Sequence, residues 1–265
     1  MSISKTIPFL IGLLALAASV PASWAQQAAT PAAAAPATVA PGPDIQPKAL
    51  EILKAMSDKL DAAKTLSFSV KTAFEEPARD GQPLFYMVQA VVSLERPNEM
   101  KVVTSGDGPP TEFLYDGKSI LEFLPASNMV AEAAAPPTLE AMLDDVYDKY
   151  GLYFPFIHFV VEDSHKKMIE GLTSAFVMGQ SKVVGGATTD VVALANDHVQ
   201  VQLWIGADDK LPRLMWLTLT HNAQKPRRMT EFSDWKLGEP VDMTPPKAEG
   251  AEKIEFARPD AAPAK

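Results

Sequence analysis

The chain has 265 residues, of which 47% are hydrophobic and 22% charged, and its formal net charge at pH 7 is −9. A surface of this sign repels phosphate backbones and anionic lipid head groups, which argues against nucleic acid as a partner. Cysteine is absent, so disulfides, thiolate metal sites, a thiol nucleophile and lipid attachment to cysteine are excluded.

The first 25 residues have the pattern of an export signal. Lys5 supplies a positive charge, residues 7–20 form an apolar run, and small residues lead up to Ala25. A membrane anchor is the alternative, but the apolar run contains Pro8 and is shorter than the roughly twenty residues that cross a bilayer. We therefore predict a signal peptide over residues 1–25, cleavage after Ala25, and a periplasmic protein without stable membrane insertion.

Two segments of biased composition flank a longer segment of mixed composition. Residues 26–44 consist mainly of Ala, Pro, Thr and Gln, and residues 245–265 mainly of Pro, Ala, Glu and Lys. Such segments contain too little apolar bulk to order themselves, so we predict a disordered linker and a mostly disordered tail. An apolar pair in the tail predicts a short edge strand near residues 254–256. Residues 45–244 are predicted to form one domain.

Helical periodicity opens this domain. Apolar residues recur at helical spacing over residues 47–63, and Pro47 suits the first turn of a helix. After Lys64 the period changes to two, and apolar residues alternate with polar ones over residues 66–71 and 84–94. The sequence therefore predicts an amphipathic helix followed by antiparallel strands.

Turn signals predict further hairpins. Asp116-Gly117 separates two short apolar runs, and Gly185-Gly186 and Asn196-Asp197 separate longer ones. The later strands are predicted at residues 176–184, 188–195, 198–205, 213–220 and 227–237. Sequential hairpins of this kind form a meander.

A second helix is predicted at residues 139–150, between the two groups of strands. Thr138 suits the N-cap position and Gly151 suits the residue that ends the helix. A less regular helical turn is predicted at residues 164–171. Since each amphipathic helix needs an apolar surface to cover, we expect an α+β fold. Two or three helices would cover the concave face of a strongly curved antiparallel sheet, an incomplete β-barrel.

Several short motifs, in this order and spacing, resemble a known family. They include Tyr-Asp-Gly-Lys at residues 115–118, Gln-Leu-Trp-Ile at 202–205, Leu-Pro-Arg at 211–213 and Phe-Ser-Asp-Trp at 232–235. From residue 49 to about residue 237 the chain resembles a family of predicted periplasmic proteins classed as a domain of unknown function. That family is similar in fold to the lipoprotein carriers LolA and LolB. The resemblance implies a LolA-like domain, in which helices close an incomplete barrel over an apolar cavity that shelters acyl chains.

The apolar faces of the predicted helices and strands supply a hypothetical cavity lining. Methionine adds an adaptable apolar surface, although it more often fills irregular cores. The predicted lining residues are Leu53, Met56, Leu60, Met142, Leu143, Val146, Val201, Leu203, Met215 and Leu217. The first hypothesis is a periplasmic, non-enzymatic carrier or binder of a hydrophobic or acylated ligand, either a lipid or a lipoprotein. The alternative is an envelope protein-interaction or sensing module with a filled core.

Signals for catalysis and for metal binding are weak. His158, Glu162 and His165 have a spacing that suits a metal on a helix, but no helical stripe surrounds them, so a surface loop is expected. Phosphate-binding glycine loops, dinucleotide fingerprints and nucleophile elbows do not occur in the sequence. We predict no catalytic residue, no metal and no cofactor. An enzyme would require a cleft that combines His198 or His221 with carboxylates.

Overall fold

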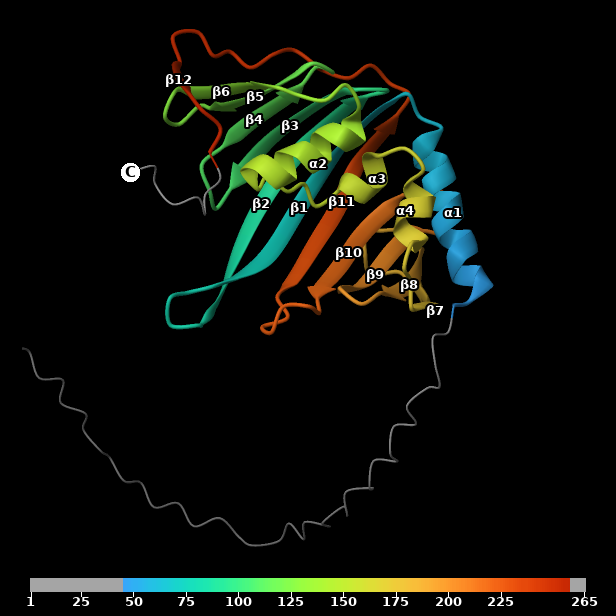
Figure 1. Ribbon diagram of the computed structural model, residues 1–265. Coiled ribbons are helices and arrows are strands. Elements are labelled where there is room, and N and C mark those ends of the chain that lie inside the picture. Colours follow the sequence, from blue (N-terminus) through green and yellow to red (C-terminus); the bar gives the residue numbers. More distant parts are fainter. Residues whose placement is uncertain (1–44, 258–265) are drawn as a thin grey trace, which may run out of the picture. The chain divides into compact units, whose positions relative to one another are not determined.

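The computed structural model describes residues 45–257. The predicted signal peptide, the predicted linker and residues 258–265 lie outside this range. Within it, a single large sheet curves around the helices that lie on its inner face (Figure 1).

The elements of the described residues follow one another in this order. The helices are α1 (Pro47–Asp61), α2 (Leu139–Tyr150), α3 (Ile157–Val160) and α4 (Ser164–Ile169). The strands are β1 (Thr65–Pro77), β2 (Pro83–Glu95), β3 (Glu99–Gly106), β4 (Thr111–Tyr115), β5 (Ser119–Leu124), β6 (Met129–Ala134), β7 (Ser174–Ser181), β8 (Thr189–Ala195), β9 (Val199–Gly206), β10 (Pro212–Leu219), β11 (Arg227–Leu237) and β12 (Glu252–Ile254).

The sheet consists of two meanders joined at its centre. Its strand order is β12-β6-β5-β4-β3-β2-β1-β11-β10-β9-β8-β7, and every neighbouring pair is antiparallel except β12 with β6. The pairing of β1 with β11 connects the meander β1–β6 to the meander β7–β11. Because β12 and β7 remain as edges, the sheet does not close into a barrel. The predicted fold class, a curved antiparallel sheet with few helices, is confirmed.

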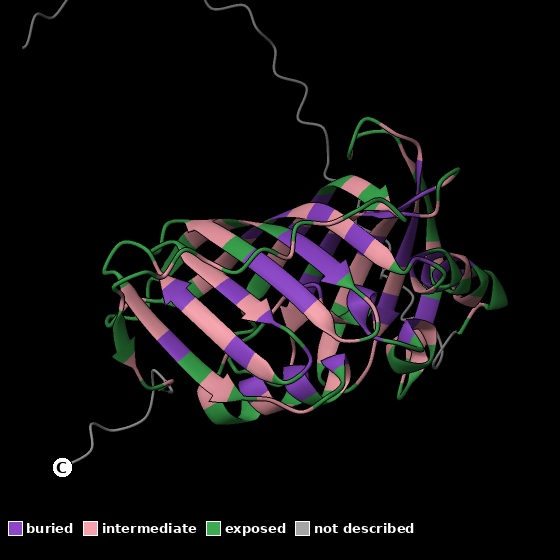
Figure 2. Cartoon of the chain, turned by 90° about the horizontal axis from the view of Figure 1, so that it is seen from above, coloured by how far each residue is buried: buried purple, intermediate pink, exposed green. Residues whose placement is uncertain are grey.

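One face of each central strand is buried, as strict alternation requires. On β1 the residues Leu66, Phe68, Val70 and Thr72 are buried, and the residues between them are more exposed. The same alternation is visible across the sheet in Figure 2. We call the face that carries these four side chains the inner face.

The helices cover the inner face of the sheet (Figure 1). Helix α1 packs against β7 and β8 and against the short helices α3 and α4. Helix α2 begins with the Thr138 hydroxyl accepting a hydrogen bond from the Ala141 N–H at 3.3 Å. It ends at Gly151, whose φ of 70° is left-handed and therefore suits glycine. Both predicted ends of this helix are confirmed.

The segment after α2 differs from the prediction of a surface loop. It contains the one-turn helix α3, so the described residues have four helices where two or three were expected. Phe156, Phe159 and Val160 are buried because they pack into the main core. Arg96, at the end of β2, donates from Nη1 to the Val160 carbonyl at 2.8 Å. The hydrogen bond holds α3 against the sheet.

The segment after β11 returns along the sheet and reaches α2. Lys101 on β3 donates to the carbonyl of Thr244 at 2.8 Å, and β12 then pairs in parallel with β6. Two residues beyond β12, the ring of Phe256 stacks on the ring of Tyr150, with 4.8 Å between their centroids. This C-terminal segment therefore fixes the last turn of α2.

Phe256→Ala is expected to loosen the end of α2. The substitution removes a stacked aromatic pair and some buried apolar area, so we expect a loss of about 1–2 kcal/mol in unfolding free energy. Amide hydrogen exchange should show faster exchange in the last turn of α2. Amides of the distant strand β9 provide the internal control, and equal acceleration in both elements would contradict a local role for the stack.

Candidate functional site

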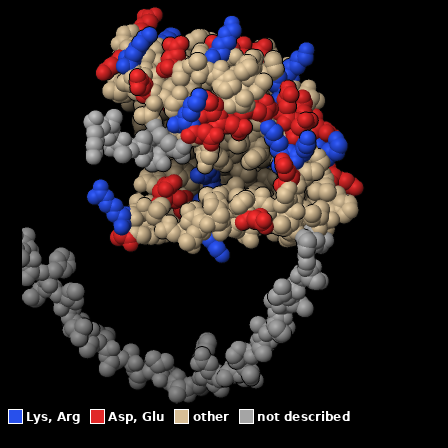
Figure 3. Space-filling view, in the orientation of Figure 1, with Lys and Arg blue, Asp and Glu red and all other residues tan. Residues whose placement is uncertain are grey.

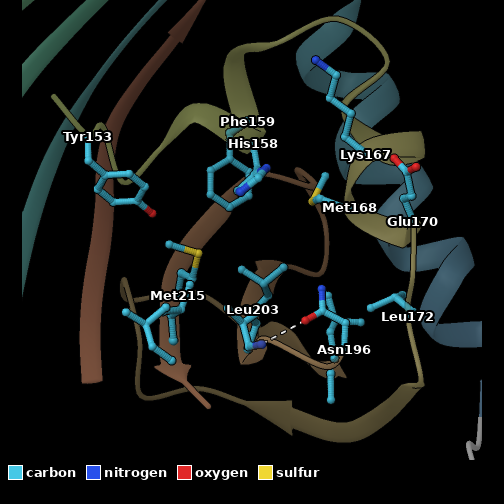
Figure 4. A pocket seen from close by; sticks show the side chains of 16 residues that line it. Tyr153, His158, Phe159, Lys167, Met168, Glu170, Leu172, Asn196, Leu203 and Met215 are labelled. Atoms are coloured by element: carbon cyan, nitrogen blue, oxygen red, sulfur yellow. Dashed lines mark hydrogen bonds between the residues drawn. The ribbon is translucent and has the colours of Figure 1, made fainter. Parts of the chain in front are cut away.

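A cavity lies between the helices and one half of the sheet. Its volume is about 290 Å³, and β8, β9 and β10 form its floor (Figure 4). The short helices and the loop after α2 form its roof. The lining residues are Tyr153, His158, Phe159, Lys167, Met168, Glu170, Leu172, Leu194, Ala195, Asn196, Val199, Val201, Leu203, Met215, Leu217 and Leu219. Most of these side chains are aliphatic or aromatic, so we call this space the apolar cavity.

Cross-strand pairing explains the floor of the apolar cavity. Leu203 on β9 lies opposite Met215 on β10, and Val201 lies opposite Leu217. Residues that are paired across strands project on the same face of a sheet. These four residues, all predicted from the sequence, therefore line the cavity together.

The other six predicted residues lie elsewhere on the inner side of the sheet. Leu143 lines a separate cavity of about 160 Å³ beside the loop that follows α2. The remaining five are fully buried in the main core: Leu53, Met56, Leu60, Met142 and Val146. The apolar faces of α1 and α2 are thus mainly packed against the core.

The roof of the apolar cavity is absent from the predicted set of ten lining residues, although a helical turn was predicted at residues 164–171. Phe159, Met168 and Leu172 come from α3, α4 and the following turn, and in Figure 4 Phe159 and Met168 lie across the space from Leu203 and Met215. These elements are too short to show a helical period. The available signal was the high density of aromatic residues between positions 153 and 159.

A few polar side chains stand at the margin of the apolar cavity. Lys167 comes from α4, Glu170 directly follows the end of α4, and His158 comes from α3. Loss of solvent around the His158 ring, together with the nearby Lys167 ammonium, lowers the pKa of His158. In Figure 3 a hollow below the charged helices is walled mostly by uncharged side chains.

A second cavity of about 190 Å³ lies on the other half of the inner face. It is bounded by β1–β5 and by the loop after α2. Its lining residues are Val70, Thr72, Val88, Ala90, Val102, Thr104, Thr111, Phe113, Glu122, Leu152, Tyr153, Phe154, Pro155 and Phe156. Three threonines and one carboxylate interrupt an otherwise apolar lining, so we call this space the threonine cavity.

Tyr153 lines both cavities and also the one beside Leu143. Its ring lies over the guanidinium of Arg228, 4.5 Å from the ring centroid, and edge-on to Tyr147. The side chain is 38% exposed, so it is not enclosed by the core. Tyr153 therefore stands at the boundary between the three spaces.

Glu122 is the charged side chain of the threonine cavity. It lies on β5, opposite Phe113 on β4 and Ala131 on β6, on the same face as the buried Tyr115 and Ile120. Within residues 45–257 its carboxylate forms no hydrogen bond and no ion pair. Loss of solvent raises the pKa of Glu122 above its ordinary value of 4.5.

Glu122→Gln is expected to stabilise the ligand-free protein at pH 7 but not at pH 4. A raised pKa in the folded state means that folding favours the protonated carboxyl, so stability is lost as the pH rises from 4.5 through the folded pKa. Glutamine has no such titration. Thermal melting at both pH values tests this expectation, with Glu112→Gln, on the outer face of β4, as the matched control. An equal effect of Glu122→Gln at both pH values would contradict it.

The histidines considered for catalysis do not enter either cavity. The rings of His198 and His221 lie 6.0 Å apart on exposed turns. Residues 45–257 contain no group of three or more His, Cys, Asp or Glu side chains placed to hold a metal ion. No helix in the same range is both long and apolar enough to cross a membrane.

The structure is similar to several solved structures. Lipoprotein LppX of Mycobacterium tuberculosis is 15% identical, with a TM-score of 0.49, covering 76% of this chain and 100% of that chain. LprF of Mycobacterium bovis is 16% identical, with a TM-score of 0.48, covering 78% and 99%. MucB of Pseudomonas aeruginosa, in its complex with MucA, is 14% identical, with a TM-score of 0.42, covering 76% and 62%. No ligand or partner of this chain follows from these likenesses.

The sequence comparisons define a family. Among curated proteins no sequence matches the chain. A family model described as "Predicted periplasmic protein (DUF2092)" matches residues 49–257. The match spans both meanders, all four helices and the edge strand β12, and it confirms the family resemblance expected from the short motifs. The chain therefore belongs to the DUF2092 family of predicted periplasmic proteins.

Proposed function

We propose that this protein is a non-enzymatic periplasmic carrier or binder of a hydrophobic or acylated ligand, such as a lipid or a lipoprotein acyl chain. The apolar cavity carries the proposal. Its volume of about 290 Å³ lies near the lower end of the roughly 300–1,000 Å³ typical of pockets for small ligands. The aliphatic side chains of the floor and the thioethers of Met215 in the floor and Met168 in the roof offer the ligand an apolar surface.

The location supports an apolar cargo. Lipids and lipoproteins that pass between two membranes must cross an aqueous compartment, where exposed acyl chains are unfavourable by about 0.8 kcal/mol per CH₂ group. A family described as predicted periplasmic proteins is suited to shield such chains. The cavity is bounded by α4 and by the loop after α2, and short elements of this kind can open at low cost.

Bound lipid provides the direct test. Protein purified from its native periplasm is expected to release lipid on organic extraction, as detected by mass spectrometry. The delipidated protein is expected to bind a fluorescent long-chain fatty acid saturably, at one site. The absence of extracted lipid together with the absence of probe binding would contradict the proposal.

Export itself has a separate test. We propose that the signal peptide at residues 1–25 directs the chain out of the cytoplasm and is removed after Ala25. N-terminal sequencing of the periplasmic protein is expected to begin at Gln26. An intact Met1 in that fraction would contradict cleavage.

An interaction module is the second candidate, and the outer face of the sheet favours it. Cross-strand pairing places Met87, Met229 and Trp216 in one row across β2, β1, β11 and β10, with Ala73 between the methionines. Met87 is 54% exposed and Trp216 is 36% exposed. Exposed apolar rows of this kind often mark protein interfaces. Trp216→Glu should impair partner binding without affecting the fatty-acid probe if this candidate is correct.

A further inference from the structure

Glu122 is an unpaired carboxylate in a place where carboxylates are unfavourable. Its neighbours across the strands are Phe113 and Ala131, and no Lys, Arg or His lines the threonine cavity. Tyr153 is the other lining residue with an ionisable side chain. Leaving water without gaining a partner destabilises a charge. A carboxylate kept at such a site is suited to pair with a group that arrives from outside the chain.

Threonine hydroxyls also line the threonine cavity, in addition to the Glu122 carboxylate. Thr104 on β3 and Thr111 on β4 lie opposite each other, and both line the threonine cavity beside Glu122. Within residues 45–257 their hydroxyls form no hydrogen bond to another side chain. The Thr72 hydroxyl lies 3.3 Å from that of Thr230, at the end of the cavity nearest β11. Glu122, Thr104 and Thr111, on the neighbouring strands β5, β3 and β4, can therefore accept hydrogen bonds from one small polar group.

The two cavities adjoin along the sheet at β1 and β11. Thr72 on β1 is paired with Thr230 on β11, which is paired with Met215 on β10 in the floor of the apolar cavity. Two strand spacings separate Thr72 from Met215, which corresponds to roughly 10 Å. Tyr153 lines both spaces, so a ligand would pass beneath or beside this side chain.

We propose that the threonine cavity receives the polar head of the ligand and that Glu122 selects for a protonated amine on it. The inference rests on the proposed function, because an alkyl chain attached to the amine would run along the inner face from Glu122 toward the apolar cavity. In the complex the ammonium group pairs with the Glu122 carboxylate, and the hydroxyls of Thr104 and Thr111 accept its remaining hydrogen bonds.

Three ligands with the same alkyl chain provide the test. Dodecylamine, dodecanol and dodecanoate are titrated into the delipidated full-length mature protein by calorimetry at pH 7, below the concentrations at which they aggregate. The wild-type protein is expected to bind dodecylamine at least tenfold more tightly than dodecanoate, with dodecanol between them. Glu122→Gln is expected to lose about tenfold in affinity for dodecylamine and none for dodecanol.

Glu112→Gln is the matched control, because Glu112 lies on the adjacent strand β4 and projects from the outer face. It should retain the wild-type preference, and circular dichroism should show both variants to be folded. Binding of all three ligands without preference, or a preference that survives in Glu122→Gln, overturns the inference and leaves the proposed function intact. Failure of the wild-type protein to bind any of the three overturns both.

Discussion

Val201→Trp is expected to lower the affinity for a long-chain fatty-acid probe at least tenfold, equivalent to about 1.4 kcal/mol of binding free energy. Val201 lies on β9 in the floor of the apolar cavity, opposite Leu217. An indole ring at this position would occupy much of a space of about 290 Å³. The residue is only partly buried, so the larger side chain can extend into the cavity without displacing the core.

The adjacent residue supplies the control for this variant. Gln200 precedes Val201 on the same strand, is exposed, and projects from the opposite face. Gln200→Trp therefore adds the same ring to the same strand and should leave probe affinity unchanged. If Val201→Trp binds the fatty-acid probe with the same affinity as the wild-type protein, the probe does not bind in the apolar cavity. The threonine cavity or the outer face would then have to be considered as the site.

Phe68→Ala is expected to reduce the unfolding free energy by about 3–5 kcal/mol. Phe68 is 1% exposed and stacks on Trp235 with 4.3 Å between ring centroids. It also contacts Phe156 edge-on at 5.6 Å and Phe232 at 6.3 Å. The ring therefore joins the two central strands to the segment that carries α3, and its removal leaves a cavity at their junction.

Urea denaturation followed by tryptophan fluorescence measures this effect, since Trp235 reports on the same contact. Phe85→Ala is the control, because Phe85 lies on the neighbouring strand β2 and is 65% exposed. Substitutions at exposed sites usually change stability by no more than about 0.5 kcal/mol. A loss below 1 kcal/mol in Phe68→Ala would mean that the aromatic cluster does not support the fold.

Local signals in the sequence were sufficient for much of the fold. Thr138 and Gly151 are strong end signals and predicted α2 with its observed bounds. The turn at Asp116-Gly117 predicted the hairpin of β4 and β5, in which the Asp116 carboxylate accepts hydrogen bonds from the backbone of Lys118 and Ser119. Helix caps and tight turns depend on residues that are close in sequence, so they can be predicted from the sequence alone.

Elements that depend on distant contacts were missed. Strand β6 is composed mainly of Ala, Met and Glu, which have little strand preference, and pairing with β5 and β12 makes it a strand. In β3 the buried Lys101 breaks the apolar pattern because its ammonium is bound by the segment around Thr244. Neither contact has a signal within the strand itself.

The candidate site was only partly predictable for a related reason. Alternation on β9 and β10 identifies the floor, since Val201 and Leu203 project on one face. A helix face such as that of Met142 and Val146 looks the same in sequence whether it borders a packed core or a cavity. Glu122 could have been found as a charge in register with Ile120 and Tyr115, on the inner face of a predicted hairpin.

The junction of β1 with β11 affects the order in which the parts of the sheet form. Thr72 and Thr230, which meet at this junction, are 158 positions apart in the chain. Local hairpins within each meander can form early, whereas a contact of this sequence separation forms late and slows folding. The floor of the apolar cavity belongs to the second meander and its roof to the segment before it. The proposed carrier function therefore requires only that the residues from Tyr153 to Leu219, which line the cavity, have left the export channel, and not that β1 and β11 have paired.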